Sequence, residues 1–228
     1  MTKTVITGAD AGLGFSFVKQ YAQAGHEVLA GCLSPHLGQI AELAQTVSNI
    51  APLKLDVTSN SSIAAFMDQM KDEPVGLLIN NAGVHYRKWS VPEDVVFSDW
   101  EHTLQVNTLG PARVSFAMRG NLARAGQSKL VTISSDWGSV TKHPGTAYDY
   151  CSSKAAVNSL MRGMAQNWVK DGITVLMVHP GWTRTSMGGE DAPATADENA
   201  EAVCAVIDNI TQKDNGRFVD NQGNDMPW

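Results

Sequence analysis

The stretch TVITGADAGLG, residues 4–14, places a short apolar run directly before three closely spaced glycines. Gly8 permits a tight turn, Gly12 lets the backbone come close to a pyrophosphate, and Gly14 allows close packing of helix on strand. The helix that follows would present its amino end to the phosphates. A purely structural turn would also use glycines, but the position between a first strand and a first helix favours a dinucleotide-binding loop.

The same order of short apolar run and longer helical pattern repeats along the rest of the chain. The expected strands lie at 4–7, 27–31, 51–55, 76–80, 129–134, 174–179 and 217–219. The expected helices lie at 12–24, 36–47, 61–70, 97–125, 151–170 and 197–210. The strands are apolar along their whole length, as in a parallel sheet that helices cover on both faces. We therefore predict a single doubly wound, Rossmann-type α/β domain over residues 1–228, with a seven-stranded, mostly parallel sheet.

The bulk composition limits the classes of function. A chain of 228 residues with 43% hydrophobic residues fits one globular domain with a sizeable core. A net charge of -6 without any basic run argues against a nucleic-acid or anionic-membrane partner. The chain has no signal-peptide or membrane-span pattern, so we expect a cytoplasmic protein. The three cysteines are widely spaced without a CxxC motif, which predicts reduced thiols and no metal site.

The stretch TAYDYCSSKAA, residues 146–156, holds two tyrosines and one lysine. Side chains four residues apart share one face of a helix, which pairs Tyr150 with Lys154 and would pair Tyr148 with Ser152. A free phenol titrates near pH ~10, and a nearby ammonium would lower the pKa of the phenol. Such a phenol can deliver or accept the proton when hydride transfer converts a carbonyl and an alcohol. Tyr150 is therefore the predicted acid/base, whereas Tyr148 either lines the substrate pocket or simply packs.

The order and spacing of these motifs resemble the short-chain dehydrogenase/reductase family, whose members use a G-x-x-x-G-x-G loop for NAD or NADP. The matching residues are the glycine loop, Leu55-Asp56-Val57, Asn80-Asn81-Ala82-Gly83, Asn107, Ile133-Ser134-Ser135, Tyr150 with Lys154, and Pro180-Gly181 followed by Thr185. The segments HPGWTRTSMGG, residues 179–189, and GNDMPW, residues 223–228, resemble the C-factor-like branch, which includes small carbonyl reductases. Each motif has an ordinary structural explanation by itself, but their joint order is specific.

The resemblance implies an oxidoreductase that transfers a hydride between a nicotinamide cofactor and an alcohol/carbonyl substrate. It makes Tyr150 the acid/base, and the positive ring of the oxidised cofactor would further favour its phenolate. It gives Lys154 a second role on the nicotinamide ribose, and lets Ser135 hold the substrate oxygen by a hydrogen bond. Asn107 would hold a water that links Lys154 to solvent, whereas Ser134 is structural. The expected cofactor contacts are Gly8, Asp10, Gly12, Leu13, Gly14, Leu33, Asp56, Val57, Asn81, Ala82, Gly83, Tyr150, Lys154, Pro180, Gly181, Thr183 and Thr185.

The end of the second strand favours NAD over NADP. Cys32 stands where an acid would bind the adenosine ribose diol, and Leu33 where an arginine would pair with the extra phosphate. NADP-using relatives often carry a basic residue at the position of Ala11, and a 2′-phosphate beside Asp10 would be costly to bury. NADP stays open as the alternative, with three polar side chains within reach of a phosphate: Ser34, His36 and Lys54.

The substrate pocket is expected from the loops after strands four, five and six. Its predicted residues are Trp137, His143, Tyr148 and Trp182, with Lys142, His85, Tyr86 and Trp89 nearby. Of these, His85 and Trp89 are interpreted as ordinary loop residues. The mainly aromatic and apolar set suits an apolar or aromatic carbonyl compound with an acidic group. The short glycine-containing stretch 186–194 predicts a mobile lid over a fairly open site.

Two other functions compete with the oxidoreductase. A cofactor-binding signalling protein with little turnover would not need Asn107, Ser135, Tyr150 and Lys154 together. A sugar-nucleotide epimerase or dehydratase would have a different spacing of glycines in the loop and carry a longer substrate domain.

The expected helix at 151–170 has one face of small residues, at positions 152, 155, 159 and 163. This face predicts a homodimer, or a tetramer, unless it packs on the monomer's own sheet.

Overall fold

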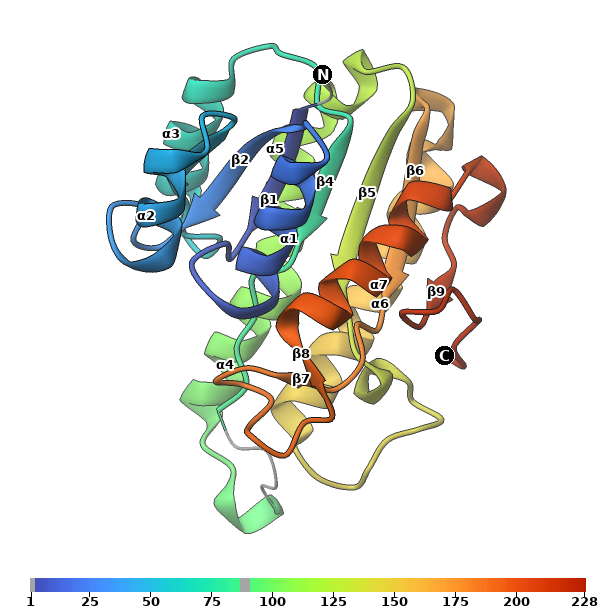
Figure 1. The fold of residues 1–228 in the computed structure, drawn as a ribbon. Helices are drawn as coiled ribbons and strands as arrows, with labels where there is room; N and C mark the ends of the chain where they lie inside the picture. Colours follow the sequence, from blue (N-terminus) through green and yellow to red (C-terminus); the bar gives the residue numbers. More distant parts are fainter. Residues whose placement is uncertain (1–2, 87–90) are drawn as a thin grey trace.

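A parallel sheet forms the centre of the protein in the computed structural model, which describes residues 3–86 and 91–228 (Figure 1). Its strands are β1 (Lys3–Thr7), β2 (Glu27–Cys32), β3 (Ile50–Lys54), β4 (Leu77–Asn80), β5 (Ser128–Ile133), β6 (Ile173–Val178) and β9 (Phe218–Val219). Within the described residues these seven strands lie in the order β3-β2-β1-β4-β5-β6-β9, and every pair is parallel. The predicted doubly wound sheet is confirmed.

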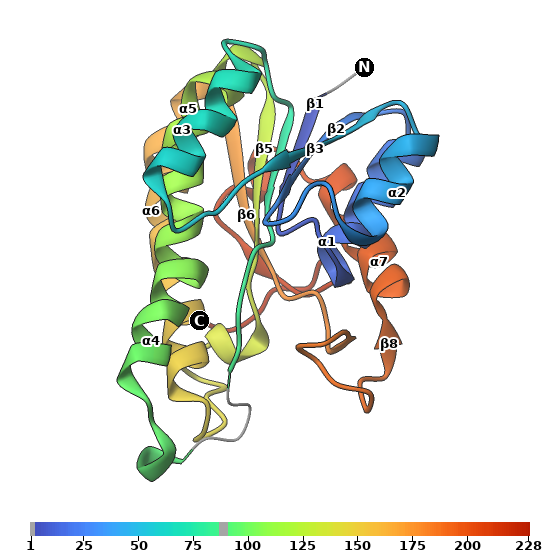
Figure 2. The ribbon, with the colours of Figure 1, turned by 90° about the vertical axis from the view of Figure 1, so that its left-hand side faces the viewer.

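Helices cover both faces of the sheet, as Figure 2 shows in an edge-on view. They are α1 (Gly12–Gln23), α2 (Gly38–Thr46), α3 (Asn60–Met70), α4 (Phe97–Leu104), α5 (Gly110–Arg124), α6 (Tyr148–Trp168) and α7 (Ala196–Asn209). Successive residues of a strand point to opposite faces, so Val5 belongs to the core under α3, α5 and α6, and Ile6 to the core under α1 and α7. Each face therefore has its own apolar layer.

The chain reverses its direction of winding at β1, whose neighbours in the sheet are β2 and β4. Ile6 lies opposite Ala30 on one side and opposite Ile79 on the other. The loops that leave β1 and β4 therefore diverge to opposite faces and open a crevice at the carboxyl edge of the sheet. Ligands of open α/β sheets bind at such a crevice.

The single helix predicted at 97–125 is wrong, because a π-helical turn at Gln105–Leu109 divides it into α4 and α5. The Gly110 N–H donates to the Gln105 carbonyl, five residues back. Pro111 explains the wide turn: it has no N–H to donate to the Asn107 carbonyl four residues back, and its ring crowds that carbonyl. The sequence pattern continues across this turn, so periodicity alone did not reveal it.

Two further boundaries differ from the prediction. Helix α6 begins at Tyr148 rather than at 151, after Ala147 in a left-handed conformation with φ of 50°. The segment after β6 contains two short paired strands, β7 (Thr183–Arg184) and β8 (Ala194–Thr195). Trp89 falls in the stretch 87–90, outside the described residues.

Three further expectations concern membrane spans, metal sites and the cysteines. Among residues 3–86 and 91–228, no helix combines the length and apolar character that a membrane span requires. In the same part of the chain, no group of three or more His, Cys, Asp or Glu side chains is placed to hold a metal ion. All three cysteines are buried and make no disulfide.

Candidate active site

A cleft of about 830 Å³ opens at the carboxyl edge of the sheet. This volume lies in the range of sites for large organic ligands. All the residues predicted to contact a cofactor line it, and so do Ser135, Trp137 and Trp182. Four residues expected at the site are not part of the lining: Asn107, Lys142, His143 and Tyr148. The cleft therefore brings together motifs that are up to 177 positions apart in the chain, from Gly8 to Thr185.

The glycine loop is packed too closely for larger side chains. Gly8 has a φ of +64°, and a Cβ there would lie 2.7 Å from the Cα of Ala82. A Cβ on Gly14 would collide with the Gly8 carbonyl and lie 2.5 Å from Nδ2 of Asn81. Ala11 gives α1 no side-chain cap, so the first-turn N–H groups of this helix are left for a ligand. A phosphate group fits this amino end, because it supplies the negative charge that the helix dipole favours.

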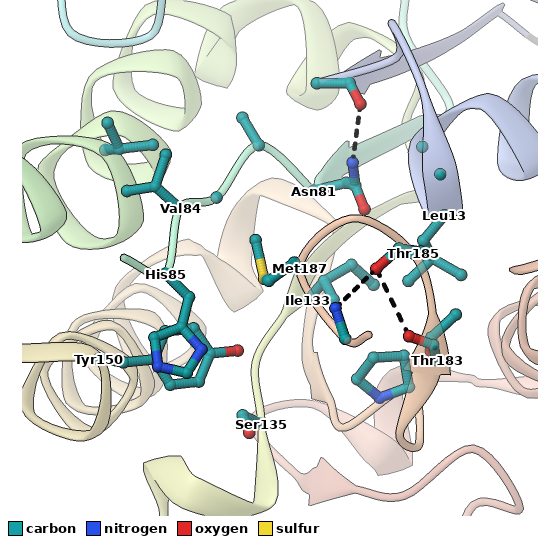
Figure 3. Close-up of a pocket in the computed structure, with 18 of the residues that line it drawn as sticks. Leu13, Asn81, Val84, His85, Ile133, Ser135, Tyr150, Thr183, Thr185 and Met187 are labelled. Carbon is teal, nitrogen blue, oxygen red and sulfur yellow. Dashed lines mark hydrogen bonds between the residues drawn. The ribbon is translucent and has the colours of Figure 1, made fainter. Parts of the chain in front are cut away.

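Thr7 and Asn81 tie the glycine loop to the end of β4. The Thr7 hydroxyl accepts hydrogen bonds from the N–H groups of Asn81 and Ala82, at 3.1 and 3.0 Å. In return, the Asn81 carboxamide donates to the carbonyls of Thr7 and Gly8, at 3.1 and 3.0 Å. Figure 3 shows Asn81 at this junction, beside Leu13 of α1. The Asn81 side chain therefore orders the loop as well as lining the cleft.

Asp10 joins the glycine loop to the segment after β2. Its carboxylate accepts hydrogen bonds from the N–H groups of Leu33 and Ser34, both at 2.9 Å. Lys54, at the end of β3, donates to the Leu33 carbonyl. The N–H groups of Leu33 and Ser34, at the predicted adenosine end of the cleft, are thus already bound to a protein carboxylate.

Asn107 acts as a clamp in the π-helical turn rather than as a wall of the cleft. Its Oδ1 accepts the Val84 N–H at 2.8 Å, and its Nδ2 donates to the Val84 carbonyl at 2.9 Å and to Ser153 Oγ at 3.0 Å. The carboxamide thereby fixes the segment after β4 against α6. The Asn107 side chain is therefore bound to groups of the protein rather than exposed in the cleft.

Lys154 and Tyr150 share one face of α6, as predicted from their spacing, with Lys154 buried and Tyr150 half-buried. The Lys154 ammonium donates to the Ile133 carbonyl at 2.9 Å and lies 5.6 Å from the centre of the Tyr150 ring. Burial lowers the pKa of Lys154 to about 8. Burial also raises the pKa of Tyr150 to about 12, against the opposing effect of a hydrogen bond with Ser135.

The predicted lowering of the Tyr150 pKa by Lys154 is therefore wrong for the protein alone. The lysine directs its ammonium to a backbone carbonyl, and removal of the phenol from water is the larger effect. The same removal from water acts on both groups, and it favours the neutral form of each. Neither burial nor this orientation could be read from the spacing of the two residues.

Two serines end β5 and have different surroundings. Ser134 donates to Oδ1 of Asn158 at 2.6 Å, within the protein. Ser135 accepts the Trp137 N–H at 3.2 Å and donates to Oδ1 of Asp136 at 3.1 Å. Ser135 thus caps a short 3-10 turn while its hydroxyl group stands beside Tyr150, as Figure 3 shows.

The interpretation of His85 as an ordinary loop residue is wrong. Its ring stacks on Tyr150, with 4.3 Å between ring centres and 22° between planes. Trp137 makes edge contacts with both rings, at 5.9 Å to His85 and 6.2 Å to Tyr150. The stacked pair is visible in Figure 3. The hydrogen bonds of Asn107 to Val84 explain this position of His85, because they direct the residue after Val84 into the cleft.

His143 and Tyr148 do not line the cleft, which corrects their assignment to the substrate pocket. The segment after Ser139 turns to the surface, where His143 is exposed. The Tyr148 hydroxyl donates to the Gly145 carbonyl at 3.3 Å, and its ring lies 5.9 Å from that of His143. Tyr148 therefore packs at the start of α6, the alternative that its sequence position left open.

The predicted lid is a compact turn between β7 and β8. Trp182 Nε1 donates to the Gly188 carbonyl at 2.8 Å, and the N–H groups of Gly188 and Gly189 donate to Thr185. The Thr185 methyl lies against Gly12, where a Cβ would be 3.1 Å away. Met187 projects into the middle of the cleft (Figure 3). The turn therefore covers part of the cleft despite its shortness.

The lining includes residues that were not predicted to belong to the site, among them Asp136, His179 and Met187. Asp136 and His179 directly adjoin the motif residues Ser135 and Pro180, so adjacency was a usable signal for both. Met187 offered none, because its position depends on how the turn folds.

Comparison with known proteins agrees with this geometry. A family model described as short chain dehydrogenase matches residues 2–196. The chain is 38% identical to the C-signal of Myxococcus xanthus over 165 residues, which is 72% of this chain and 99% of that protein. It is 31% identical to the 1-hydroxy-2-glutathionyl-2-methyl-3-butene dehydrogenase of Rhodococcus sp. (strain AD45), over 100% of both chains.

Solved structures show the same likeness. The NADPH-bound carbonyl reductase from chicken fatty liver superposes with a TM-score of 0.88 at 31% identity, covering 100% of this chain and 98% of that one. A carbonyl reductase from Pseudomonas aeruginosa PAO1 gives a TM-score of 0.90 at 25% identity, over 100% of both chains.

The buried Lys154 makes the stability of the protein depend on pH. Its folded pKa of about 8 lies below the ordinary 10.5, so between these values the unfolded chain holds more protons at this residue. Raising the pH therefore stabilises the folded state. We expect the unfolding free energy of the wild type, relative to Lys154→Met, to rise by about 2 kcal/mol from pH 7 to pH 10.

Urea denaturation of both proteins at pH 7, 8.5 and 10 measures this difference, and other titrating groups cancel in it. Lys170→Met is the control, because Lys170 is exposed at the end of the same helical segment. An equal pH dependence in wild type and Lys154→Met would contradict the assignment of a depressed pKa to Lys154.

Proposed function

Because the chain belongs to the short-chain dehydrogenase family, we propose that Tyr150 is the acid/base of its alcohol/carbonyl oxidoreductase reaction. The observation that carries the proposal is the meeting of Ser135, Tyr150 and Lys154 in the same cleft as the glycine loop. These groups come from β5, α6 and the loop after β1, so their meeting depends on the fold and not on any one motif. Residues 1–228 would act as one domain, with the substrate site built from the loops after β4, β5 and β6.

The residues of the cleft fit a nicotinamide dinucleotide. The uncapped amino end of α1 and the closely packed Gly8 and Gly14 leave backbone donors and room for a pyrophosphate. Lys154 would hold the nicotinamide ribose, and Asp56 would contact the adenine. When bound, the cofactor supplies or accepts the hydride, a chemistry that no side chain can provide.

The proton steps fall to the side chains around Tyr150. In reduction, Tyr150 gives its phenol proton to the substrate oxygen as negative charge develops there, and in oxidation it takes the proton back. Ser135 would orient that oxygen. A pKa of about 12 keeps the free phenol protonated at neutral pH, so the protein alone is prepared to donate a proton to a carbonyl. Proton exchange with solvent would pass by Lys154 and a water held by Asn107.

The walls of the cleft support an apolar or aromatic carbonyl compound as substrate. His85 and Trp137 form an aromatic surface with the Tyr150 ring, and Met187 and Trp182 of the segment after β6 line the same cleft. A planar or unsaturated group could pack against these side chains with its oxygen toward Ser135. Turnover with a panel of ketones, aldehydes and alcohols, followed by NADH or NADPH fluorescence, tests the reaction and its substrate class.

NAD is the proposed preference, although the similar chicken reductase is bound to NADPH. Asp10 supports it, since this carboxylate already uses the N–H groups of Leu33 and Ser34 that a 2′-phosphate would need. The phosphate would also meet a negative charge without a new cation beside it. Lys54 is the nearest alternative partner, and it donates to the Leu33 carbonyl.

A second candidate is a cofactor-binding signalling protein with little turnover, which the 38% identity to the C-signal of Myxococcus xanthus supports. The two candidates differ in one measurable property. The enzyme turns over many equivalents of cofactor with a carbonyl or alcohol substrate, whereas the signalling protein binds cofactor without consuming it.

The exposed side of α6 supports a homodimer. A side chain at Gly163 would meet no other atom within 4 Å, and Ser159 is exposed, so this part of the helix does not pack on the protein's own sheet. On the neighbouring α5, Phe116 is 57% exposed. A second copy related by a two-fold axis would cover these small and apolar groups, and a tetramer would need a further surface.

Replacing Tyr150 by Phe should lower kcat by about 100-fold or more, because only the proton donor is lost. Cofactor binding should stay nearly unchanged, as measured by fluorescence titration. Tyr148→Phe is the matched control, and it should be mild because its hydroxyl reaches only Gly145. An inactive Tyr148→Phe beside an active Tyr150→Phe would reverse the assignment.

NAD should bind at least about tenfold more tightly than NADP, a difference of ~1.4 kcal/mol. Asp10→Asn should narrow this gap by improving NADP binding, since it removes the charge but keeps an acceptor for one N–H group. Glu42→Gln, an exposed carboxylate on α2, is the control for charge alone. Tighter binding of NADP to the wild type in calorimetric titration would overturn the preference.

Gly163→Trp should weaken self-association more than it weakens the fold. Light scattering at micromolar concentration measures the first effect and urea denaturation the second. Ala64→Trp, on the exposed side of α3, should leave the mass of the assembly unchanged. A monomeric mass for the wild type would rule out the dimer and leave the catalytic assignment untouched.

A further inference from the structure

Two asparagines that no motif predicts hold the loop that follows β6. Asn199 lies in the first turn of α7 and is only 5% exposed, and Asn221 lies half-buried in the segment after β9. Neither residue lines the cleft, whereas Gly181, Trp182 and Thr183 of the loop do, and Thr183 is labelled in Figure 3. Any effect of the two asparagines on a bound ligand must therefore pass through the loop.

The two carboxamides form a continuous chain of hydrogen bonds with this loop. Asn221 Nδ2 donates to the Pro180 carbonyl at 3.2 Å and to Asn199 Oδ1 at 3.1 Å. Asn199 Nδ2 donates to the Thr183 hydroxyl at 2.8 Å, and that hydroxyl donates to the Gly181 carbonyl at 3.0 Å. The loop is thus held at its first residue and at its last.

Gly181 makes the shape of the loop depend on these bonds. Its φ is +85°, and a glycine adopts positive and negative φ about equally well. The peptide between Pro180 and Gly181 can therefore turn over at little cost to its own backbone. A Cβ on Gly181 would lie 3.0 Å from Asn221 Nδ2 and 3.2 Å from Asn199 Oδ1, so both carboxamides pack directly against this residue. They are what keeps the peptide in one orientation.

The first turn of α7 gives Asn199 a fixed base. The Thr195 side chain and Glu198 cap the helix reciprocally. In the same turn, Asp197 Oδ1 accepts a hydrogen bond from Ser16 at 2.5 Å, and Oδ2 accepts one from Lys19 at 2.8 Å. Both donors belong to α1, the helix whose amino end faces the cleft. Asn199 therefore holds the loop against the same helix that would receive the phosphates.

The loop lies beside the reacting groups and not at the adenosine end of the cleft. Strand β6 pairs with β5, and the Asp136 N–H donates to Nδ1 of His179 at 3.0 Å. Asp136 directly follows Ser135, and His179 directly precedes Pro180. The predicted adenosine end is at β2, on the other side of β1 and β4. A dinucleotide that spans the cleft would thus have its nicotinamide half at this loop.

We propose that Asn199 and Asn221 are positioning residues that lock the loop from Pro180 to Thr183 in the shape that receives the nicotinamide half of the cofactor. The proposal rests on the proposed function, since it requires a nicotinamide dinucleotide in this cleft. A loop that is already ordered costs nothing further when the ligand binds, whereas a loop whose peptide can turn over has to be ordered by the ligand. Loss of the lock should therefore weaken the binding of a ligand that carries the nicotinamide ring.

Asn199→Ala tests the lock with two ligands that differ only at this end of the cleft. ADP-ribose has the adenosine, the pyrophosphate and the second ribose of NADH but lacks the nicotinamide. In calorimetric titration we expect the Kd of NADH to rise about tenfold, as for the loss of one hydrogen bond to a buried group. The Kd of ADP-ribose should change by less than about twofold. Asn221→Ala should act in the same direction.

Asn121→Ala is the matched control. Asn121 is also buried, and its Nδ2 donates to the carbonyls of Lys71 and Glu73 at 2.9 and 2.8 Å, before β4 begins at the opposite edge of the sheet. This variant should lose stability in urea denaturation and keep the wild-type ratio of the two Kd values. A role of Asn199 in stability alone would give the same pattern as this control.

The hydroxyl of Thr183 provides a second test of the pathway. Thr183→Val removes the group through which Asn199 is bound to the loop, at nearly constant volume. If Asn199 acts through it, Asn199→Ala should weaken NADH binding clearly less in the Thr183→Val protein than in the wild type. Asn221→Ala, at a half-buried position, keeps the test available if Asn199→Ala does not fold.

The outcomes separate this inference from the proposed function. Equal losses for NADH and ADP-ribose, or unchanged NADH binding in both asparagine variants, would overturn the role of the two residues and leave the proposed function standing. An active Tyr150→Phe would defeat the catalytic assignment and leave the binding result untouched. A wild-type protein that does not bind NADH would contradict both.

Discussion

The reciprocal hydrogen bonds between Thr7 and Asn81 hold the reactive edge of the sheet in one shape. Thr7 ends β1 and Asn81 directly follows β4, the neighbouring strand, although the two residues are 74 positions apart in the chain. The hydroxyl accepts two N–H groups, and the carboxamide donates to two carbonyls, so backbone groups that the strands leave unpaired are satisfied within the protein. These bonds hold the glycine loop in place at the edge of the cleft. The loop therefore has little freedom to adjust, which explains why glycines are needed within it.

Local rules predicted the parts of the molecule that depend on local geometry. The spacing of Tyr150 and Lys154 implied one helix face, and the glycine loop implied a strand, a turn and a helix, and all of these are present. The π-helical turn was missed because apolar periodicity runs through it, although Pro111 carries the physical cause. His85 was interpreted as an ordinary loop residue and His143 as a pocket residue, and both assignments were wrong for a different reason. The hydrogen bonds from Asn107 to Val84 direct His85 into the cleft. The loop that carries His143 runs along the surface, so that side chain is exposed.

Electrostatics at the site could not be predicted from residue types, because burial outweighs charge pairing there. Lys154 and Tyr150 are both shifted toward their neutral forms, although a lysine beside a tyrosine suggests an ion pair. Removal from water acts on each group separately, whereas attraction requires that the two charged ends face each other. Here the ammonium faces a carbonyl instead. Keeping Lys154 and Tyr150 out of water therefore costs folding free energy. The burial of apolar residues on both faces of the sheet has to offset this cost.

The wide turn at Gln105–Leu109 limits how the length of this chain can vary. One additional residue in a helix rotates everything after it by about 100° relative to a regular helix. Deletion of any one residue in the turn would therefore rotate α5 and carry Val114, Met118 and Leu122 away from the sheet they now cover. It would also withdraw the Asn107 carboxamide from Val84. Related chains can lengthen or shorten their surface loops, but at this position we expect a fixed number of residues, because the core and the clamp share one helical register.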